Sequence, residues 1–191
     1  CWTISNITAG TPEQIQAVIN AGVFPKLIEL LRSSEFDIQK ESAWAVSNAT
    51  SGGTPEQIFY LISIGAVPPL CNLLTVQDVK IVTVALEGLE NMLKCAETTN
   101  NLEKLIDLFH ECNGTSIIED LQNHDNKTIY QRATSILEHY FGAEEVDENE
   151  MMPEVVTNAD GGQQFHFGGP PASGAAGAPG GGGLPRLRAP V

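Results

Sequence analysis

The 191 residues carry 24 acidic side chains against 10 Lys and Arg, which gives a net charge of −14. This balance argues against nucleic acid as a direct partner, because binding phosphates requires a basic face, and it favours a cationic partner. No apolar run reaches membrane-spanning length, so we expect no membrane partner. Residues 1–141 are rich in Leu, Ile, Val and Ala, whereas residues 142–191 are acidic and then rich in Gly, Pro and Ala. Only the first part can bury a core.

Internal repetition is the strongest signal in the chain. The pentapeptide TPEQI occurs at 11–15 and again at 54–58, an offset of 43 residues. A Trp–Asn pair with a spacing of four residues also recurs, at an offset of 42 residues. The extra glycine of a Gly-Gly pair just before the second TPEQI accounts for the difference.

Each unit contains the signals of three helices. In the first unit, Thr11 and Gln14 form a capping-box pattern before a short helix that ends near Gly22. Apolar spacing predicts a second helix over 24–32 and a third over 37–50. Three helices at this period are typical of the armadillo repeat. We therefore predict an all-α, right-handed armadillo-repeat solenoid with three helices per repeat and a disordered C-terminal tail.

The predicted organisation has five segments. The chain starts within a helix that has no N-cap signal, so we expect a fragment of a longer protein. In the third, divergent unit, helices are predicted over 102–112, 116–123 and 127–141. The segments are the end of a truncated repeat at 1–10, armadillo repeats at 11–53 and 54–95, a divergent C-terminal capping repeat at 96–142, and the tail at 143–191.

The repeated Trp–Asn pairs predict a binding groove. Residues four apart share one face of a helix, so Trp2 and Asn6 project together, as do Trp44 and Asn48. An Asn amide can bond the backbone of an extended peptide, and Trp faces attract a Lys or Arg side chain that lies between them. Glu41 lies three residues before Trp44 on the same helix and is our candidate for the carboxylate that selects a cation.

Two other classes of function were weighed against this groove. For an enzyme, we find no catalytic or cofactor-binding motif: the four His are scattered without metal-ligand spacing, and the Gly run at 180–183 lacks the Lys of a phosphate loop. We therefore expect that the chain is not an enzyme and that it binds no cofactor and no metal. A different armadillo scaffold, of the beta-catenin type, would bind acidic or mixed peptides through a basic groove. The absence of Lys and Arg among the predicted groove residues argues against it.

Four segments carry a family resemblance: CWTISNITAG at 1–10, AWAVSNATSGG at 43–53, LEGLEN at 86–91 and EHYF at 138–141. They resemble the importin alpha family, the adaptor that carries cargo with a nuclear localisation signal to importin beta. The resemblance covers about residues 1–150 and is to the C-terminal part of the adaptor, from inside the seventh repeat through the tenth.

The resemblance implies roles for individual residues in a minor cargo site. Ser5 and Glu41 match family positions that help to hold a basic side chain. Glu87 occupies the position equivalent to Trp44, whereas Asn91 keeps the Asn, so these two residues mark a possible extension at which the groove ends. The residues implied to bind the signal peptide are Trp2, Ser5, Asn6, Glu41, Trp44 and Asn48.

The resemblance also implies partners and a location. The partners are basic cargo proteins, importin beta through a segment that this chain does not contain, and the recycling exportin. Tyr130, Glu138 and Tyr140 in the last repeat are the candidates for exportin binding. Such an adaptor shuttles through the nuclear pore between cytoplasm and nucleus, and the four Cys, which have no CxxC spacing, are consistent with reduced thiols there.

Overall fold

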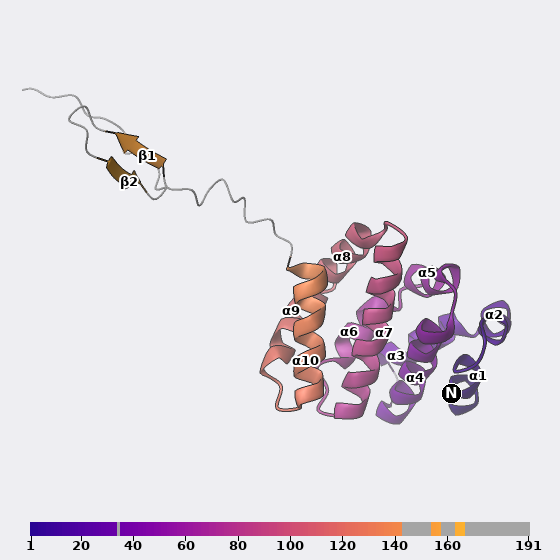
Figure 1. The fold of residues 1–191 in the computed structure, drawn as a ribbon. Coiled ribbons are helices and arrows are strands. Elements are labelled where there is room, and N and C mark those ends of the chain that lie inside the picture. The colour runs from indigo at the N-terminus through magenta and orange to yellow at the C-terminus, as the bar shows by residue number, and fades with distance from the viewer. Residues whose placement is uncertain (34, 143–153, 158–162, 167–191) are drawn as a thin grey trace, which may run out of the picture. The chain divides into compact units, whose positions relative to one another are not determined.

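Helices stacked in groups of three form the first of the two units into which the chain divides, Cys1–Glu144 and Glu145–Val191 (Figure 1). The computed structural model describes residues 1–33, 35–142, 154–157 and 163–166. The helices, in chain order, are α1 (Trp2–Thr8), α2 (Pro12–Asn20), α3 (Phe24–Ser33), α4 (Phe36–Gly52), α5 (Pro55–Ser63), α6 (Val67–Leu73), α7 (Val79–Thr98), α8 (Leu102–Glu111), α9 (Gly114–Asp120) and α10 (Lys127–Ile136).

Local sequence signals set the helix ends in both full repeats. The predicted capping box is confirmed: Thr11 and Gln14 exchange side-chain bonds with each other's backbone at the start of α2. Thr54 and Gln57 form an equivalent capping box at the start of α5. Both helices are followed by a glycine with a positive φ, 65° at Gly22 and 84° at Gly65. That conformation costs a glycine little, so the chain can reverse into the next helix.

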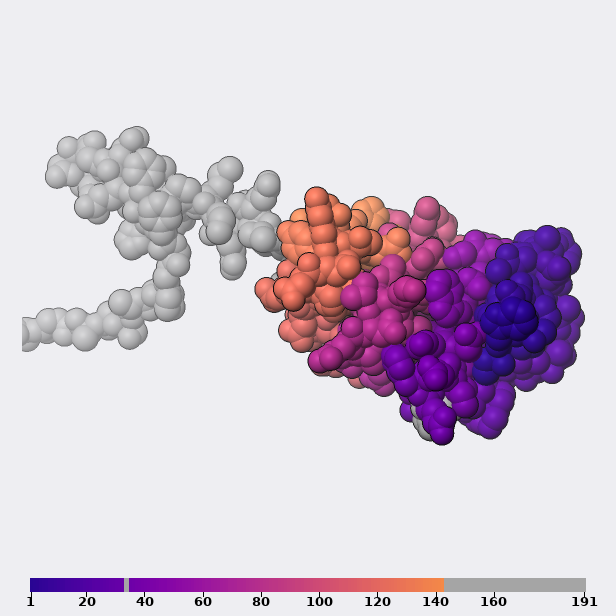
Figure 2. Space-filling view, turned by 90° about the horizontal axis from the view of Figure 1, so that it is seen from below, coloured from indigo at the N-terminus to yellow at the C-terminus, as the bar shows by residue number. Residues whose placement is uncertain are grey.

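Equivalent helices of successive repeats pack against one another. The row α1, α4, α7 and α10 forms one face of the stack, and α3, α6 and α9 form a second row behind it (Figure 1). Figure 2 shows the repeats as adjoining bands of colour from the N-terminal to the C-terminal end of this unit. A Cβ added at Gly52 would lie 2.9 Å from the carbonyl oxygen of Gly10, so glycine allows this close approach of neighbouring repeats.

The core runs between the helix rows through every repeat. No repeat could bury these apolar faces alone, so the stacking itself supplies the hydrophobic stabilisation. The predicted all-α armadillo solenoid is therefore confirmed. The largest fully buried side chains are Phe24, Phe109, Ile15, Leu61, Leu70, Leu74, Ile81, Leu86, Leu89, Met92, Leu93 and Ile118.

The third unit departs from the regular pattern. Its second helix, α9, continues into a short 3-10 turn, η1 (Leu121–Asn123). The single helix predicted over 127–141 is an α-helix only to Ile136, and a π-helical turn, η2 (Leu137–Phe141), completes it. Periodicity alone does not distinguish these tighter and wider turns from an α-helix.

The tail predicted to be disordered, 143–191, lies outside the described residues except for two short strands. β1 (Glu154–Thr157) and β2 (Gln163–His166) pair in antiparallel register, with Glu154 opposite His166 and Thr157 opposite Gln163. The β-branched and aromatic residues in the two segments favour extended backbone.

Within the described part of the chain, no helix combines the length and apolarity that a membrane crossing requires.

Candidate functional site

A cleft of about 240 Å³ lies between α1 and α4, on the face formed by the third helices. Three of its lining residues come from each helix, and the Trp and Asn on each stand at equivalent positions of two successive repeats. The lining residues are Trp2, Ser5, Asn6, Glu41, Trp44 and Asn48. These are the six residues for which the sequence predicts peptide binding, and the fold brings all of them together.

The two tryptophans present exposed rings to this cleft. Trp2 is 70% exposed and Trp44 is 43% exposed, although the residues on either side of Trp44 are buried alanines. A large aromatic side chain that is not needed for the core favours a binding role, because exposing it forfeits the stabilisation that burial would give.

Ser5 and Glu41 connect the two sides of the cleft. Ser5 is buried, and its hydroxyl donates a hydrogen bond of 2.8 Å to the carbonyl of Trp2. The same oxygen lies 3.5 Å from Oε2 of Glu41 on the neighbouring helix. The Glu41 carboxylate is thus held at the wall of the cleft, where it can attract a cation.

The asparagines have a structural role that the sequence reasoning missed. Asn48 Nδ2 donates to the carbonyl of Ser5 in the preceding repeat, at 3.0 Å. Asn91 Nδ2 repeats this link one repeat later, with the hydroxyls of Thr50 and Ser51 at 3.1 Å and 3.0 Å. Asn6, in contrast, donates to Trp2 on its own helix, at 3.0 Å. The persistence of Asn91 where Trp is lost was the signal in the sequence for this role.

Asn48 keeps part of its bonding capacity for a ligand. An Asn amide has two N–H donors and one carbonyl acceptor. Only one donor of Asn48 is used, and its carbonyl oxygen accepts no hydrogen bond from the residues that the structure describes. A peptide backbone could therefore bond Asn48 without breaking its link to Ser5.

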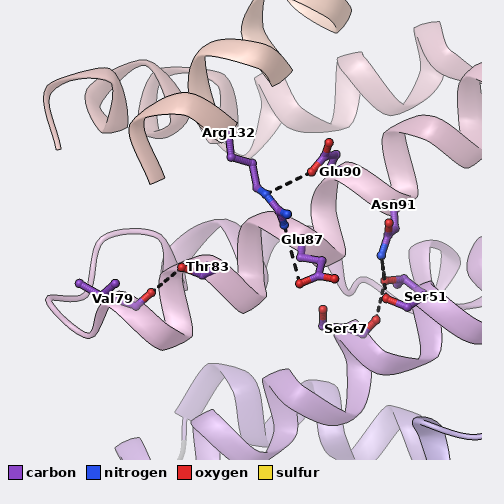
Figure 3. Close-up of polar contacts among 9 residues, drawn as sticks. Ser47, Ser51, Val79, Thr83, Glu87, Glu90, Asn91 and Arg132 are labelled. Atoms are coloured by element: carbon purple, nitrogen blue, oxygen red, sulfur yellow. Dashed lines mark hydrogen bonds and ion pairs between the residues drawn. The ribbon is translucent and has the colours of Figure 1, made fainter. Parts of the chain in front are cut away.

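Glu87 and Asn91, the possible extension, do not line the cleft. Glu87 instead forms an ion pair with Arg132 of α10, whose Nη1 lies 3.7 Å from Glu87 Oε2 (Figure 3). Arg132 Nε lies 3.4 Å from Oε2 of Glu90, which is also on α7. Sequence reasoning did not single out Arg132, because it lies in the divergent unit, where the repeat pattern is weakest.

The structure brings together two of the three residues proposed for exportin binding. Glu138 and Tyr140 line a cavity of about 640 Å³ in the last repeat, together with Phe141 and His110, whereas Tyr130 is not among its lining residues. Tyr130 is 44% exposed on α10. Burial raises the pKa of the Tyr140 phenol, and the charge of the nearby Glu97 adds to the rise.

The described residues contain no group of three or more His, Cys, Asp or Glu that could hold a metal ion.

Comparison with known proteins identifies both the repeats and their relatives. The sequence matches the Armadillo/beta-catenin-like repeat family over residues 11–51 and 54–94, and the atypical Arm repeat family over residues 103–154. A designed armadillo repeat protein solved in complex with the peptide (KR)4 is 32% identical, with a TM-score of 0.61, over 73% of this chain and 55% of that chain.

The most informative relatives are plant proteins. The chain is 47% identical over 179 residues to importin subunit alpha-4 of Arabidopsis thaliana, a match that covers 91% of this chain and 33% of that protein. It is 52% identical over 173 residues to importin subunit alpha-1a of Oryza sativa subsp. japonica, covering 88% and 32%. The chain spans about a third of the length of these relatives. With armadillo and atypical Arm repeats matched over most of its length, the chain belongs to the armadillo-repeat family, and it is similar to importin alpha subunits along most of that length.

Proposed function

We propose that the chain binds an extended peptide rich in Lys and Arg in the cleft between α1 and α4. The observation that carries the proposal is the cleft itself, in which two exposed Trp rings, a carboxylate and an Asn amide with spare hydrogen-bonding groups line one space of about 240 Å³. This combination suits a long cationic side chain on an extended backbone.

Each group has a separate task in this proposal. The aliphatic stem of a Lys or Arg lies between the rings of Trp2 and Trp44, which attract its charge with about 0.5–2 kcal/mol. Glu41 takes the charged end of the side chain. Asn48 bonds the peptide backbone, which is the same for every sequence. The rings and the carboxylate therefore select the side chain, and Asn48 fixes the register.

The similarity to importin alpha subunits suggests which peptides these are. We propose that the ligand is the nuclear localisation signal of a cargo protein, and that the chain acts in a nuclear import adaptor that shuttles between cytoplasm and nucleus with importin beta as its carrier. The name of the designed relative, which is bound to (KR)4, supports a basic peptide on this fold. A beta-catenin-like scaffold for acidic peptides is not favoured, since no Lys or Arg lines the cleft among the described residues.

A peptide titration tests the proposed function. A fluorescent Lys/Arg-rich peptide is titrated against the chain, against Trp44→Ala and against Phe36→Ala. Phe36 is the matched control, because it is 39% exposed on the same helix but does not line the cleft. We expect Trp44→Ala to weaken binding about tenfold, which corresponds to a loss of about 1.4 kcal/mol of binding free energy. We expect Phe36→Ala to leave the affinity unchanged. Equal affinities for all three proteins would rule the site out.

We also propose that the last repeat binds the recycling exportin through Tyr130, Glu138 and Tyr140. The cavity beside Glu138 and Tyr140 and the exposure of Tyr130 support this surface. The test is a pull-down with purified exportin, in which Tyr130→Ala combined with Glu138→Lys should lose binding while the basic peptide still binds. Full retention of exportin by this variant would place that partner elsewhere.

A further inference from the structure

The repeat alignment gives Arg132 a defined position. Ser135 of α10 is equivalent to Glu87 of α7 and to Trp44 of α4, because the repeats are offset by 48 and 43 residues there. Three residues before Trp44 stands Glu41, which faces the cleft. Three residues before Ser135 stands Arg132. The position that carries the acidic group in the Trp-lined slot thus carries a basic group in the slot between α7 and α10.

The opposite wall of that slot also differs in charge: it changes from neutral to acidic. On α1, the wall residues are Trp2 and Ser5, and their equivalents on α7 are Glu87 and Glu90. A slot with one acidic and two neutral groups therefore becomes a slot with one basic and two acidic groups. The cation that the first slot would take from a ligand is supplied here by the protein.

The contacts show that Arg132 is seated between these carboxylates. Figure 3 shows the side chain reaching from α10 toward both of them, with Nη1 3.7 Å from Glu87 and Nε 3.4 Å from Glu90. The Arg132 side chain is 30% exposed. Its Nη1 atom is buried and, among the described residues, has no hydrogen-bond partner, so the ion pair with Glu87 is what compensates it.

We propose that Arg132 fills the α7–α10 slot in place of a basic side chain from the ligand. It thereby closes the peptide groove at this slot and limits how many basic side chains of a ligand the groove can bind. The inference rests on the proposed function, and it makes Arg132 a specificity-determining residue of the same groove. A ligand cation entering this slot would meet the like charge of Arg132 and would have to displace it from both carboxylates. Without Arg132, Glu87 and Glu90 would form an acidic slot open to a further Lys or Arg.

The spacing of the groove defines the peptides for a test. Neighbouring helices are about 10 Å apart and an extended chain rises roughly 3.3 Å per residue, so successive slots correspond to about three residues of peptide. The first peptide carries one basic cluster in a Gly/Ser background and is called the short peptide after that single cluster. Two further peptides of the same total length, called the extended peptides, carry an additional Lys-Arg pair six or seven residues from the cluster. The pair lies on the N-terminal side in one and on the C-terminal side in the other, so that either direction of binding is sampled.

The three peptides are titrated against the chain and against Arg132→Gln, Arg132→Lys and Lys26→Gln. Lys26→Gln makes the same charge change on α3, at an exposed ion pair that does not line the cleft. We expect the wild-type chain, Arg132→Lys and Lys26→Gln to bind neither extended peptide more tightly than the short peptide. We expect Arg132→Gln to bind one of the two extended peptides about three- to fivefold more tightly than the short peptide, which corresponds to the gain of one exposed ion pair.

The outcomes separate the two proposals. If the short peptide binds but no extended peptide gains affinity in Arg132→Gln, the role of Arg132 is wrong and the proposed function stands. The same holds if the wild-type chain already gains from the additional pair, because the slot is then open. If no peptide binds any variant, the proposed function fails and the inference fails with it.

Discussion

The side-chain amide of Asn48 donates a 3.0 Å hydrogen bond to the backbone carbonyl of Ser5, across the boundary between two repeats. The residue that would bond the peptide backbone thus also ties α4 to α1. Because the bond joins two helices whose register fixes the cleft, binding and stability are linked at this position.

Replacing Asn48 should therefore weaken both properties. We expect Asn48→Ala to lower the free energy of unfolding by about 1 kcal/mol, the net contribution of one hydrogen bond, and to weaken all extended peptides alike. Asn6→Ala is the control, because Asn6 is exposed and, within the described part of the chain, bonds only its own helix. Urea denaturation measures the difference, and equal stability of the two variants would show that the link to Ser5 contributes nothing.

Glu41 should affect basic ligands selectively. We expect Glu41→Gln to weaken a Lys/Arg-rich peptide about fivefold at low salt, because one ion pair is lost, and the difference from wild type should shrink as salt rises. Calorimetric titration at two ionic strengths measures this. Glu103→Gln, an equal charge change at an exposed position on α8, serves as control and should bind as wild type does.

Gln14 and Gln57 have the same local role, so comparing their substitutions measures how much the inter-repeat hydrogen bonds of Gln57 contribute to stability. Gln14 and Gln57 occupy equivalent capping boxes. Gln57 is also buried, and its Nε2 donates to the Pro12 carbonyl and to Gln16 Oε1, both at 2.9 Å. We expect Gln57→Ala to cost about 1–3 kcal/mol more stability than Gln14→Ala, since two further hydrogen bonds to the preceding repeat are lost. Indistinguishable unfolding curves would contradict this.

The thiol pair between the second and third units makes a prediction about pH. Cys112 Sγ lies 3.8 Å from Cys71 Sγ, and a hydrogen bond from Cys71 to the thiolate lowers the pKa of Cys112 to about 7. The same pairing, together with burial, raises the pKa of Cys71. Cys112 should therefore be protonated and slow to alkylate below pH 7, and should react increasingly fast as the pH rises through its pKa, while Cys71 stays protected.

Site-resolved mass spectrometry after brief treatment with iodoacetamide measures these rates. In Cys71→Ala, the donor is lost, so the pH at which Cys112 reacts at half its maximal rate should move upward, toward the ordinary thiol pKa of about 8.5. An unchanged pH profile would mean that Cys71 does not stabilise the thiolate.

The sequence by itself determined the helices and the residues of the cleft. Capping boxes at Thr11 and Thr54, the glycines that close α2 and α5, and the apolar spacing of each helix act over a few residues, so they are legible without the fold. The cleft was predictable for a different reason. Stacked repeats place equivalent positions side by side, so the recurrence of Trp2 as Trp44 already specified a shared site.

Only the tertiary structure decided how neighbouring repeats are joined and which residue pairs with Glu87 and Glu90. The bond from Asn48 to Ser5 and the ion pairs of Arg132 with Glu87 and Glu90 join residues about 40 positions apart. They depend on how far one helix is rotated and shifted against the next, which no local pattern fixes. In the last unit the repeat has diverged and its third helix ends in a π-helical turn, so the ion pairs of Arg132 became visible only once α10 was packed against α7.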